Sequence, residues 1–228
     1  MKLTKLIIIA AASAVAHAQQ ATTTTSAISE NDAYLDVSGV YNEFSGNVDA
    51  EGFRVNGGFA FGNGLSLDGR FENAYLDLTG FGPGGPGEPA AATEVKFNEL
   101  RALVHYTHQV NDGAALIGGL GYGKLGFNYG GSELISTEGL LADIGVQIKS
   151  DRVSAALTYT HLFAFHTASF AFGGGEQLQD EDLGFLEGSL GYQVNDNVSA
   201  ILSVQTQVLG DTEIEKELSV ALGLRYNF

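Results

Sequence analysis

The last eleven residues of this 228-residue chain alternate between apolar side chains and side chains that are polar or small. In the segment LSVALGLRYNF, every second residue from Leu218 to Phe228 is apolar. Successive side chains of a β-strand point to opposite faces, so the pattern predicts a strand with one apolar and one polar face. Its length is about that of a tilted strand that crosses a lipid bilayer. The segment is therefore predicted to be a membrane-crossing strand.

Similar alternating runs recur along the chain, separated by turn signals, and ten can be counted. The strongest turn signal is Asn63-Gly64, a dipeptide typical of tight β-hairpins. The predicted strands cover residues 33–41, 52–61, 65–76, 95–108, 114–127, 139–148, 153–163, 184–192, 198–208 and 218–228.

The connections between these runs alternate in length. Short turns are predicted at residues 63–64, 109–113, 149–152 and 194–197. The longer connections cover residues 43–49, 79–93, 128–136, 164–182 and 209–215. Alternating short turns and longer loops are typical of transmembrane β-barrels with an even number of strands. The pattern favours ten strands; an eight-stranded barrel would follow if one weak pair were only a hairpin within a loop.

These features together resemble small bacterial outer-membrane β-barrels of the OmpA-type transmembrane and opacity-type families. The resemblance implies an all-β fold, a ten-stranded antiparallel transmembrane β-barrel formed by residues 32–228. It also implies an integral position in the outer membrane, surrounded by lipid and lipopolysaccharide, with both termini in the periplasm. Tyr226 and Phe228 would then form the signal that the barrel-assembly machinery recognises.

The amino terminus predicts export. Lys2 and Lys5 precede an apolar run, and Ala16-His17-Ala18 fits a signal-peptidase cleavage site. Residues 1–18 are therefore interpreted as a signal peptide, because the apolar run is too short for a membrane-anchoring helix. The polar, Thr-rich residues 19–31 are expected to form a flexible segment.

Composition argues against several function classes. The chain has no cysteine, and its formal charge of −16 argues against nucleic-acid binding. The histidines beyond the signal peptide form neither a metalloprotease motif nor a triad with Asp and Ser. The Gly/Pro-rich residues 80–89 lack the lysine of a phosphate-binding loop, and the acidic residues 180–182 are interpreted as a solvated loop. No catalytic, cofactor or metal site is predicted, and no enzymatic activity is expected.

The charged residues inside the predicted strands are more informative. Strand parity directs ten of them into the lumen, and a barrel this narrow holds little beyond its own side chains. Buried charges persist when they are paired, so we expect a plug of Arg–carboxylate pairs, with a selective channel as the alternative. These residues are Asp36, Arg54, Asp68, Arg70, Glu72, Glu99, Arg101, Asp143, Glu187 and Arg225.

Three lysines are expected to contact lipid headgroups. Parity directs Lys96, Lys124 and Lys216 outward at the loop ends of their strands. Long cationic side chains there can reach the headgroup layer, either by plain snorkelling or by contact with lipopolysaccharide phosphates. Outward tyrosines near the strand ends are expected to form aromatic girdles.

The sequence thus favours a structural or surface-interaction barrel that anchors exposed loops, which an extracellular partner could contact. A narrow porin-like channel for small solutes is the alternative, and an outer-membrane enzyme is the third reading.

Overall fold

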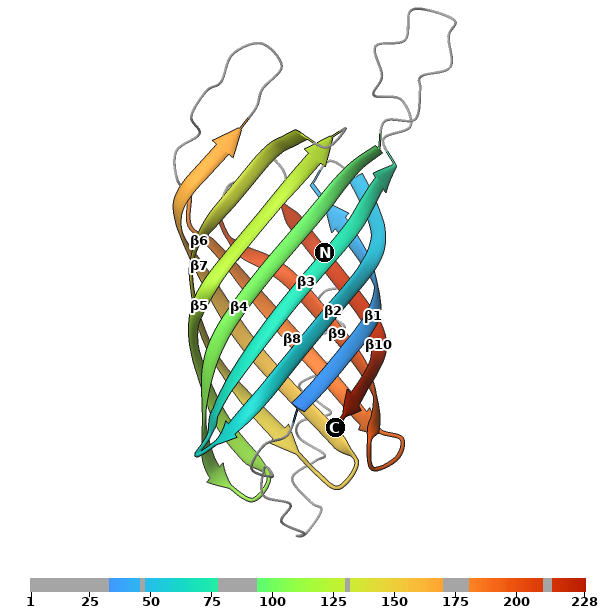
Figure 1. The fold of residues 1–228 in the computed structure, drawn as a ribbon, viewed down its shortest axis with the longest axis vertical. Helices are drawn as coiled ribbons and strands as arrows, with labels where there is room; N and C mark the ends of the chain where they lie inside the picture. The colour runs from blue at the N-terminus through green and yellow to red at the C-terminus, as the bar shows by residue number, and fades with distance from the viewer. Residues whose placement is uncertain (1–32, 46–47, 78–93, 130–131, 170–180, 211–214) are drawn as a thin grey trace, which may run out of the picture.

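Ten antiparallel strands form one closed barrel in a computed structural model of the chain (Figure 1). The structure describes residues 33–45, 48–77, 94–129, 132–169, 181–210 and 215–228. Each strand pairs with its neighbours in sequence, and β1 pairs with β10 to close the barrel. The predicted signal peptide, residues 19–31 and much of the predicted long loops lie outside the described residues.

The strands follow the order of the chain. They are β1 (Ala33–Phe44), β2 (Val48–Gly62), β3 (Leu65–Asp77), β4 (Glu94–Asn111), β5 (Ala114–Tyr129), β6 (Ser132–Lys149), β7 (Val153–Ser169), β8 (Leu183–Gln193), β9 (Val198–Leu209) and β10 (Lys216–Asn227).

The prediction of ten strands is confirmed, and the eight-stranded alternative is wrong. Several strands are longer than predicted. β6 begins at Ser132 and pairs with β5 as far as Tyr129, so the predicted loop at 128–136 is largely strand. β7 likewise continues to Ser169. These extensions are rich in polar residues, which hide the apolar alternation on which the prediction depended.

The two ends of the barrel differ. The turns after β2, β4, β6 and β8 lie together at the lower end in Figure 1, which we call the turn end. Ala33 and Phe228 also meet there, because the amide N–H of Phe228 donates to the carbonyl oxygen of Ala33 at 2.9 Å. The opposite end, where β1, β3, β5, β7 and β9 end, is called the loop end.

The outer surface of the barrel is apolar. Ile144, Leu120 and Leu222 are 68%, 62% and 66% exposed, and many other outward aliphatic and aromatic side chains are also exposed. A continuous apolar surface of this kind suits lipid rather than water. Among the described residues, no helix is both long and apolar enough to cross a membrane.

Outward tyrosines occur near both ends of the strands, as expected for aromatic girdles. Tyr106, Tyr192 and Tyr226 are exposed toward the turn end, and Tyr41 and Tyr122 are exposed toward the loop end. Tyr226 also packs edge-on against Phe228, with ring centroids 4.9 Å apart. The predicted assembly signal is therefore an exposed aromatic pair on the outer face of the turn end.

An arginine on the lipid-facing surface should destabilise the barrel according to its depth. Ile144→Arg should lower the free energy of unfolding in bilayers by about 2–4 kcal/mol, the cost expected near the midplane. Val194→Arg is the matched control, because Val194 is 56% exposed but lies in the turn after β8. Equal losses in the two variants, measured by denaturant titration, would contradict a membrane-embedded belt.

Candidate functional site

The lumen is the candidate functional site, and its side chains form three layers along the barrel axis. An apolar layer lies at the loop end, a network of charges crosses the middle, and a polar chamber occupies the turn end. The middle network, called the charge plug, consists of Arg54, Arg70, Glu72, Glu99, Arg101, Glu187 and Lys216.

Arg54 on β2 has the most extensive contacts in the charge plug. Its Nε donates to Glu72 Oε2 on β3 at 2.8 Å. Its two terminal nitrogens donate to Ser203 Oγ on β9 and Ser219 Oγ on β10, each at 3.0 Å. The Arg54 side chain is 1% exposed. One buried guanidinium therefore joins four strands, with its charge balanced by a carboxylate as burial requires.

Arg70 and Glu187 span the full width of the lumen. Their strands, β3 and β8, lie five positions apart in a ring of ten and so face each other. The guanidinium donates two hydrogen bonds to the carboxylate, at 2.7 and 2.9 Å. Bidentate pairs of this type are strong and directional. This pair forms a bar across the lumen on the chamber side of Arg54.

Lys216 also belongs to the charge plug, so the prediction that it faces lipid is wrong. Its Nζ lies 3.0 Å from Glu72 Oε1 and 3.4 Å from Glu99 Oε2, and the side chain is 3% exposed. The cause is a register shift, because Glu43 pairs with Leu218 but Phe44 pairs with Lys216. The extra residue, Glu217, reverses the parity on which the prediction relied.

Arg101 completes the charge plug on the side of β4. Its Nε is paired with Glu99, and its guanidinium stacks on the ring of Phe185, 5.1 Å from the centroid. Both Glu99 and Arg101 are buried. Six of the ten charged residues that were predicted to face the lumen therefore belong to one connected network.

The apolar layer lies on the loop side of the plug and was not predicted. Phe44, Phe97 and Phe127 pack against one another with centroids 5.3 Å apart. The sequence did contain a signal. In β4 the apolar residues Val95 and Phe97 point inward, whereas Leu100 and the alternate residues after it point outward. This change of phase marks where the outer face of the barrel becomes polar. The layer consists of Val40, Phe44, Ala50, Ala74, Leu76, Val95, Phe97, Phe127 and Ala221.

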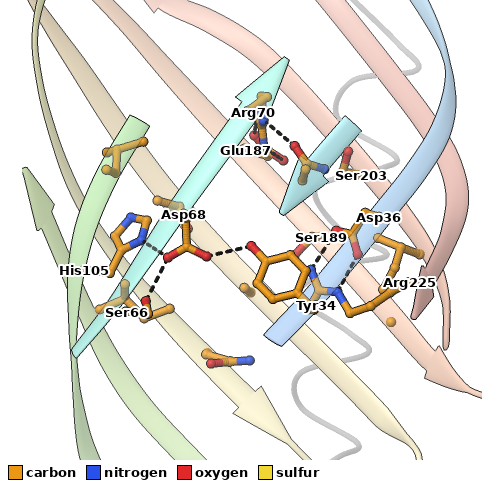
Figure 2. Close-up of a pocket in the computed structure, with 18 of the residues that line it drawn as sticks. Tyr34, Asp36, Ser66, Asp68, Arg70, His105, Glu187, Ser189, Ser203 and Arg225 are labelled. Carbon is orange, nitrogen blue, oxygen red and sulfur yellow. Dashed lines mark hydrogen bonds and ion pairs between the residues drawn. The ribbon is translucent and has the colours of Figure 1, made fainter. Parts of the chain in front are cut away.

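The polar chamber lies between the charge plug and the turn end (Figure 2). Its volume is about 430 Å³, so the prediction that the lumen holds little beyond its own side chains is only partly right. Asp36 and Arg225 form a bidentate pair on its wall, at 2.7 and 2.8 Å. The Arg225 guanidinium also stacks on Tyr34, 4.2 Å from the ring centroid.

A chain of hydrogen bonds lies flat along the chamber wall, and we call it the wall belt. Tyr34 Oη donates to Asp68 Oδ1 at 2.6 Å, and Ser66 Oγ donates to Asp68 Oδ2 at 2.8 Å. His105 Nδ1 lies 2.7 Å from Asp68 Oδ2, and His105 Nε2 lies 2.8 Å from Asp143 Oδ2. Figure 2 shows Tyr34, Asp68 and His105 following one another along the wall. The sequence placed both aspartates in the lumen but pointed to neither Tyr34 nor His105 as their partner.

Two glycines make the wall belt possible. Tyr34 on β1 reaches Asp68 on β3 by crossing β2 at Gly58, where a Cβ atom would lie 2.8 Å from Tyr34 Cζ. His105 on β4 reaches Asp143 on β6 by crossing β5 at Gly119, where a Cβ atom would lie 2.8 Å from His105 Nε2. Without side chains at these two positions, the rings lie against the wall and the chamber stays open.

The remaining predicted lysines lie on the outer surface. Lys96 Nζ lies over the Tyr75 ring, 5.0 Å from its centroid. Lys124 Nζ pairs with Glu133 Oε1 at 2.9 Å. Their contact with headgroups stays a prediction.

No group of three or more His, Asp or Glu side chains among the described residues is arranged to hold a metal ion. The described lumen therefore combines an apolar layer, a network of paired charges and a polar chamber.

No protein-family model matches the chain, and no curated protein matches it either. Solved structures do. The outer membrane protease OmpT from Escherichia coli superimposes with a TM-score of 0.53 at 10% identity, covering 91% of this chain and 99% of that one. This likeness shows that the chain has the fold of bacterial outer-membrane β-barrels.

Two other outer-membrane proteins also match, at lower TM-scores. The attachment invasion locus protein Ail of Yersinia pestis matches with a TM-score of 0.40 and 14% identity, over 87% of this chain and 99% of that one. OprG from Pseudomonas aeruginosa matches with a TM-score of 0.40 and 9% identity, over 87% and 96%.

Adding a methyl group under the wall belt should destabilise the barrel. Gly58→Ala and Gly119→Ala should each lower the free energy of unfolding by about 1–3 kcal/mol, because the new Cβ overlaps Tyr34 or His105. Gly57→Ala and Gly118→Ala are matched controls, since a Cβ there meets nothing closer than 3.6 and 3.9 Å. The controls should be neutral or slightly stabilising. If Gly58→Ala and Gly119→Ala lost no more free energy of unfolding than the two control variants, the wall belt would be contradicted.

Proposed function

We propose that this protein is a structural outer-membrane barrel that anchors loops at the cell surface and does not conduct solutes. Two successive layers of side chains close its lumen, and the Arg70–Glu187 bar is the observation that carries the proposal. In this proposal the turn end and both termini face the periplasm, and the longer connections face outward. The function is non-enzymatic.

The energetics of the charge plug support a closed lumen. A solute moving along the axis would have to separate the Arg70 and Glu187 side chains, which meet from opposite walls. It would also have to displace Arg54 from Glu72 and two serine hydroxyls. Removing one partner of such a buried pair typically costs about 3–5 kcal/mol. Beyond the plug it would meet the packed Phe44, Phe97 and Phe127 rings.

A narrow channel is the second candidate, and the chamber is the observation that favours it. A polar space of about 430 Å³ at the turn end could admit small solutes. The chamber ends at Arg70, Arg101 and Glu187, which belong to the plug. A channel would therefore require the plug to rearrange, whereas an anchoring barrel needs no change.

The exposed surfaces suit the remaining partners of the proposal. The Tyr226–Phe228 pair is accessible at the turn end for recognition by the barrel-assembly machinery, with Phe228 71% exposed. The loops that an extracellular partner would contact lie largely outside the described residues.

The unmodified protein should show no stable conductance in a planar lipid bilayer. Arg54→Ala should lower the free energy of unfolding by about 3–5 kcal/mol, because Glu72 would lose its guanidinium partner while staying buried. Arg152→Ala, in the exposed turn after β6, is the control. It should change neither the conductance nor the free energy of unfolding. A large, steady conductance of the unmodified protein would favour the channel instead.

Lys96 and Lys124 are proposed to contact lipopolysaccharide phosphates at the loop end. Replacing both with Gln should lower the unfolding temperature in bilayers that contain lipopolysaccharide, but not in phospholipid bilayers. The control replaces Lys149 and Arg152 with Gln, because these two cations are exposed at the turn end. If the unfolding temperatures of the two double variants changed equally in both kinds of bilayer, Lys96 and Lys124 would only snorkel and would not contact the phosphates.

A further inference from the structure

The His105 ring lies between two carboxylates. Its Nδ1 and Nε2 are 2.7 Å from Asp68 Oδ2 and 2.8 Å from Asp143 Oδ2. Asp68 is ionised in this arrangement, because its two oxygens also accept hydrogen bonds from Tyr34 and Ser66. A neutral imidazole has only one N–H group and could donate to only one of the two carboxylates. The geometry therefore calls for an additional proton in the His105–Asp143 contact.

The relative basicity of the two groups places this proton on His105. An imidazole is more basic than a carboxylate, so the pair exists as imidazolium and Asp143 carboxylate. As an imidazolium, His105 donates from both ring nitrogens and satisfies both neighbours. The ring is partly buried, with 15% of the side chain exposed, and Asp143 is 8% exposed.

The charge balance of the lumen supports the same assignment independently. Between the turns and the loop-end rim, the described strands direct six carboxylates and five permanent cations inward. The lumen is therefore electrically neutral only when His105 carries a positive charge, and neutrality is what a poorly hydrated interior favours. The carboxylates are Asp36, Asp68, Glu72, Glu99, Asp143 and Glu187, and the cations are Arg54, Arg70, Arg101, Lys216 and Arg225.

The strands around the ring contribute few other groups that titrate. β3 contributes Asp68 and, one inward position further, Arg70, which is bound to Glu187. β6 contributes Asp143, and β5 presents only Gly119 beneath the ring. Tyr34 on β1 reaches the ring only through Asp68. Of the groups in this cluster, His105 is therefore the one suited to switch its charge.

We propose that His105 is a proton-controlled lock on the chamber wall. With its proton in place, it ties β3, β4 and β6 together through Asp68 and Asp143. When the proton leaves, one of the two hydrogen bonds is lost and the facing lone pairs repel. The wall belt then opens at one carboxylate, and the lumen acquires one net negative charge. The lock responds to the pH of the compartment at the turn end, where the chamber lies.

Nuclear magnetic resonance of the unmodified protein tests the protonation state directly. In micelles or nanodiscs at about pH 7.5, where an ordinary imidazole is mostly neutral, both His105 ring nitrogens should show the ¹⁵N shifts of an imidazolium and carry protons. His105→Gln identifies the signals by their loss. A single protonated ring nitrogen at this pH would overturn the proposal.

Thermal unfolding tests the lock. The unfolding temperature should fall by several degrees as pH rises through the His105 titration observed by NMR, because the imidazolium contacts are lost. In His105→Gln this fall should disappear. His108→Gln, on the same strand but exposed on the outer side, should keep the full pH dependence.

Asp143→Asn provides a second variant should Gln fail to fold at position 105. An amide at 143 removes one of the two carboxylates while keeping the shape of the side chain. The His105 proton should then be released at lower pH than in the unmodified protein. Unchanged titration in Asp143→Asn, or the same pH dependence in His105→Gln as in the parent, would overturn the proposal.

Discussion

The structure depends on the pairing of charges inside a narrow barrel with an apolar outer surface. Arg54 illustrates the constraint, since its guanidinium is almost fully buried and can be tolerated only with Glu72 and two serine hydroxyls beside it. Those partners come from three other strands. Satisfying one charge therefore fixes the relative positions of β2, β3, β9 and β10 around the lumen.

Whether a polar side chain blocks the lumen or leaves it open depends on its direction. Arg70 reaches across the barrel to Glu187 and forms a bar. Tyr34 and His105 instead lie along the wall, because Gly58 and Gly119 leave space beneath their rings. The same requirement for partners thus produces a plug in the middle of the barrel and an open chamber at the turn end.

Much of the fold followed from the period-two pattern, since each run of alternating residues proved to be a strand. The inward charges also followed from parity. Lys216 did not, because a bulge at Glu217 reverses parity and nothing in the local sequence marks it. An imbalance was visible, however: four inward arginines were predicted against six carboxylates, and Lys216 supplies one of the missing cations.

The partners of His105 could not be predicted from the sequence. The ring points into the lumen, and its contacts with Asp68 and Asp143 depend on the register of β3, β4, β5 and β6. The apolar layer was recoverable from the phase change in β4 at Asn98 to Leu100, where inward apolar residues give way to outward ones.

Thiol labelling tests the closed lumen most directly, because the chain has no cysteine of its own. Ser189→Cys places a thiol in the chamber, and Ala74→Cys places one in the apolar layer, where Ala74 is fully buried. In proteoliposomes, a water-soluble, membrane-impermeant thiol reagent should modify Cys at 189 from the turn end only. It should leave Cys at 74 unmodified from either side while the barrel is folded. Equal labelling of the two positions, or labelling at 189 from the loop end, would show that the lumen is open.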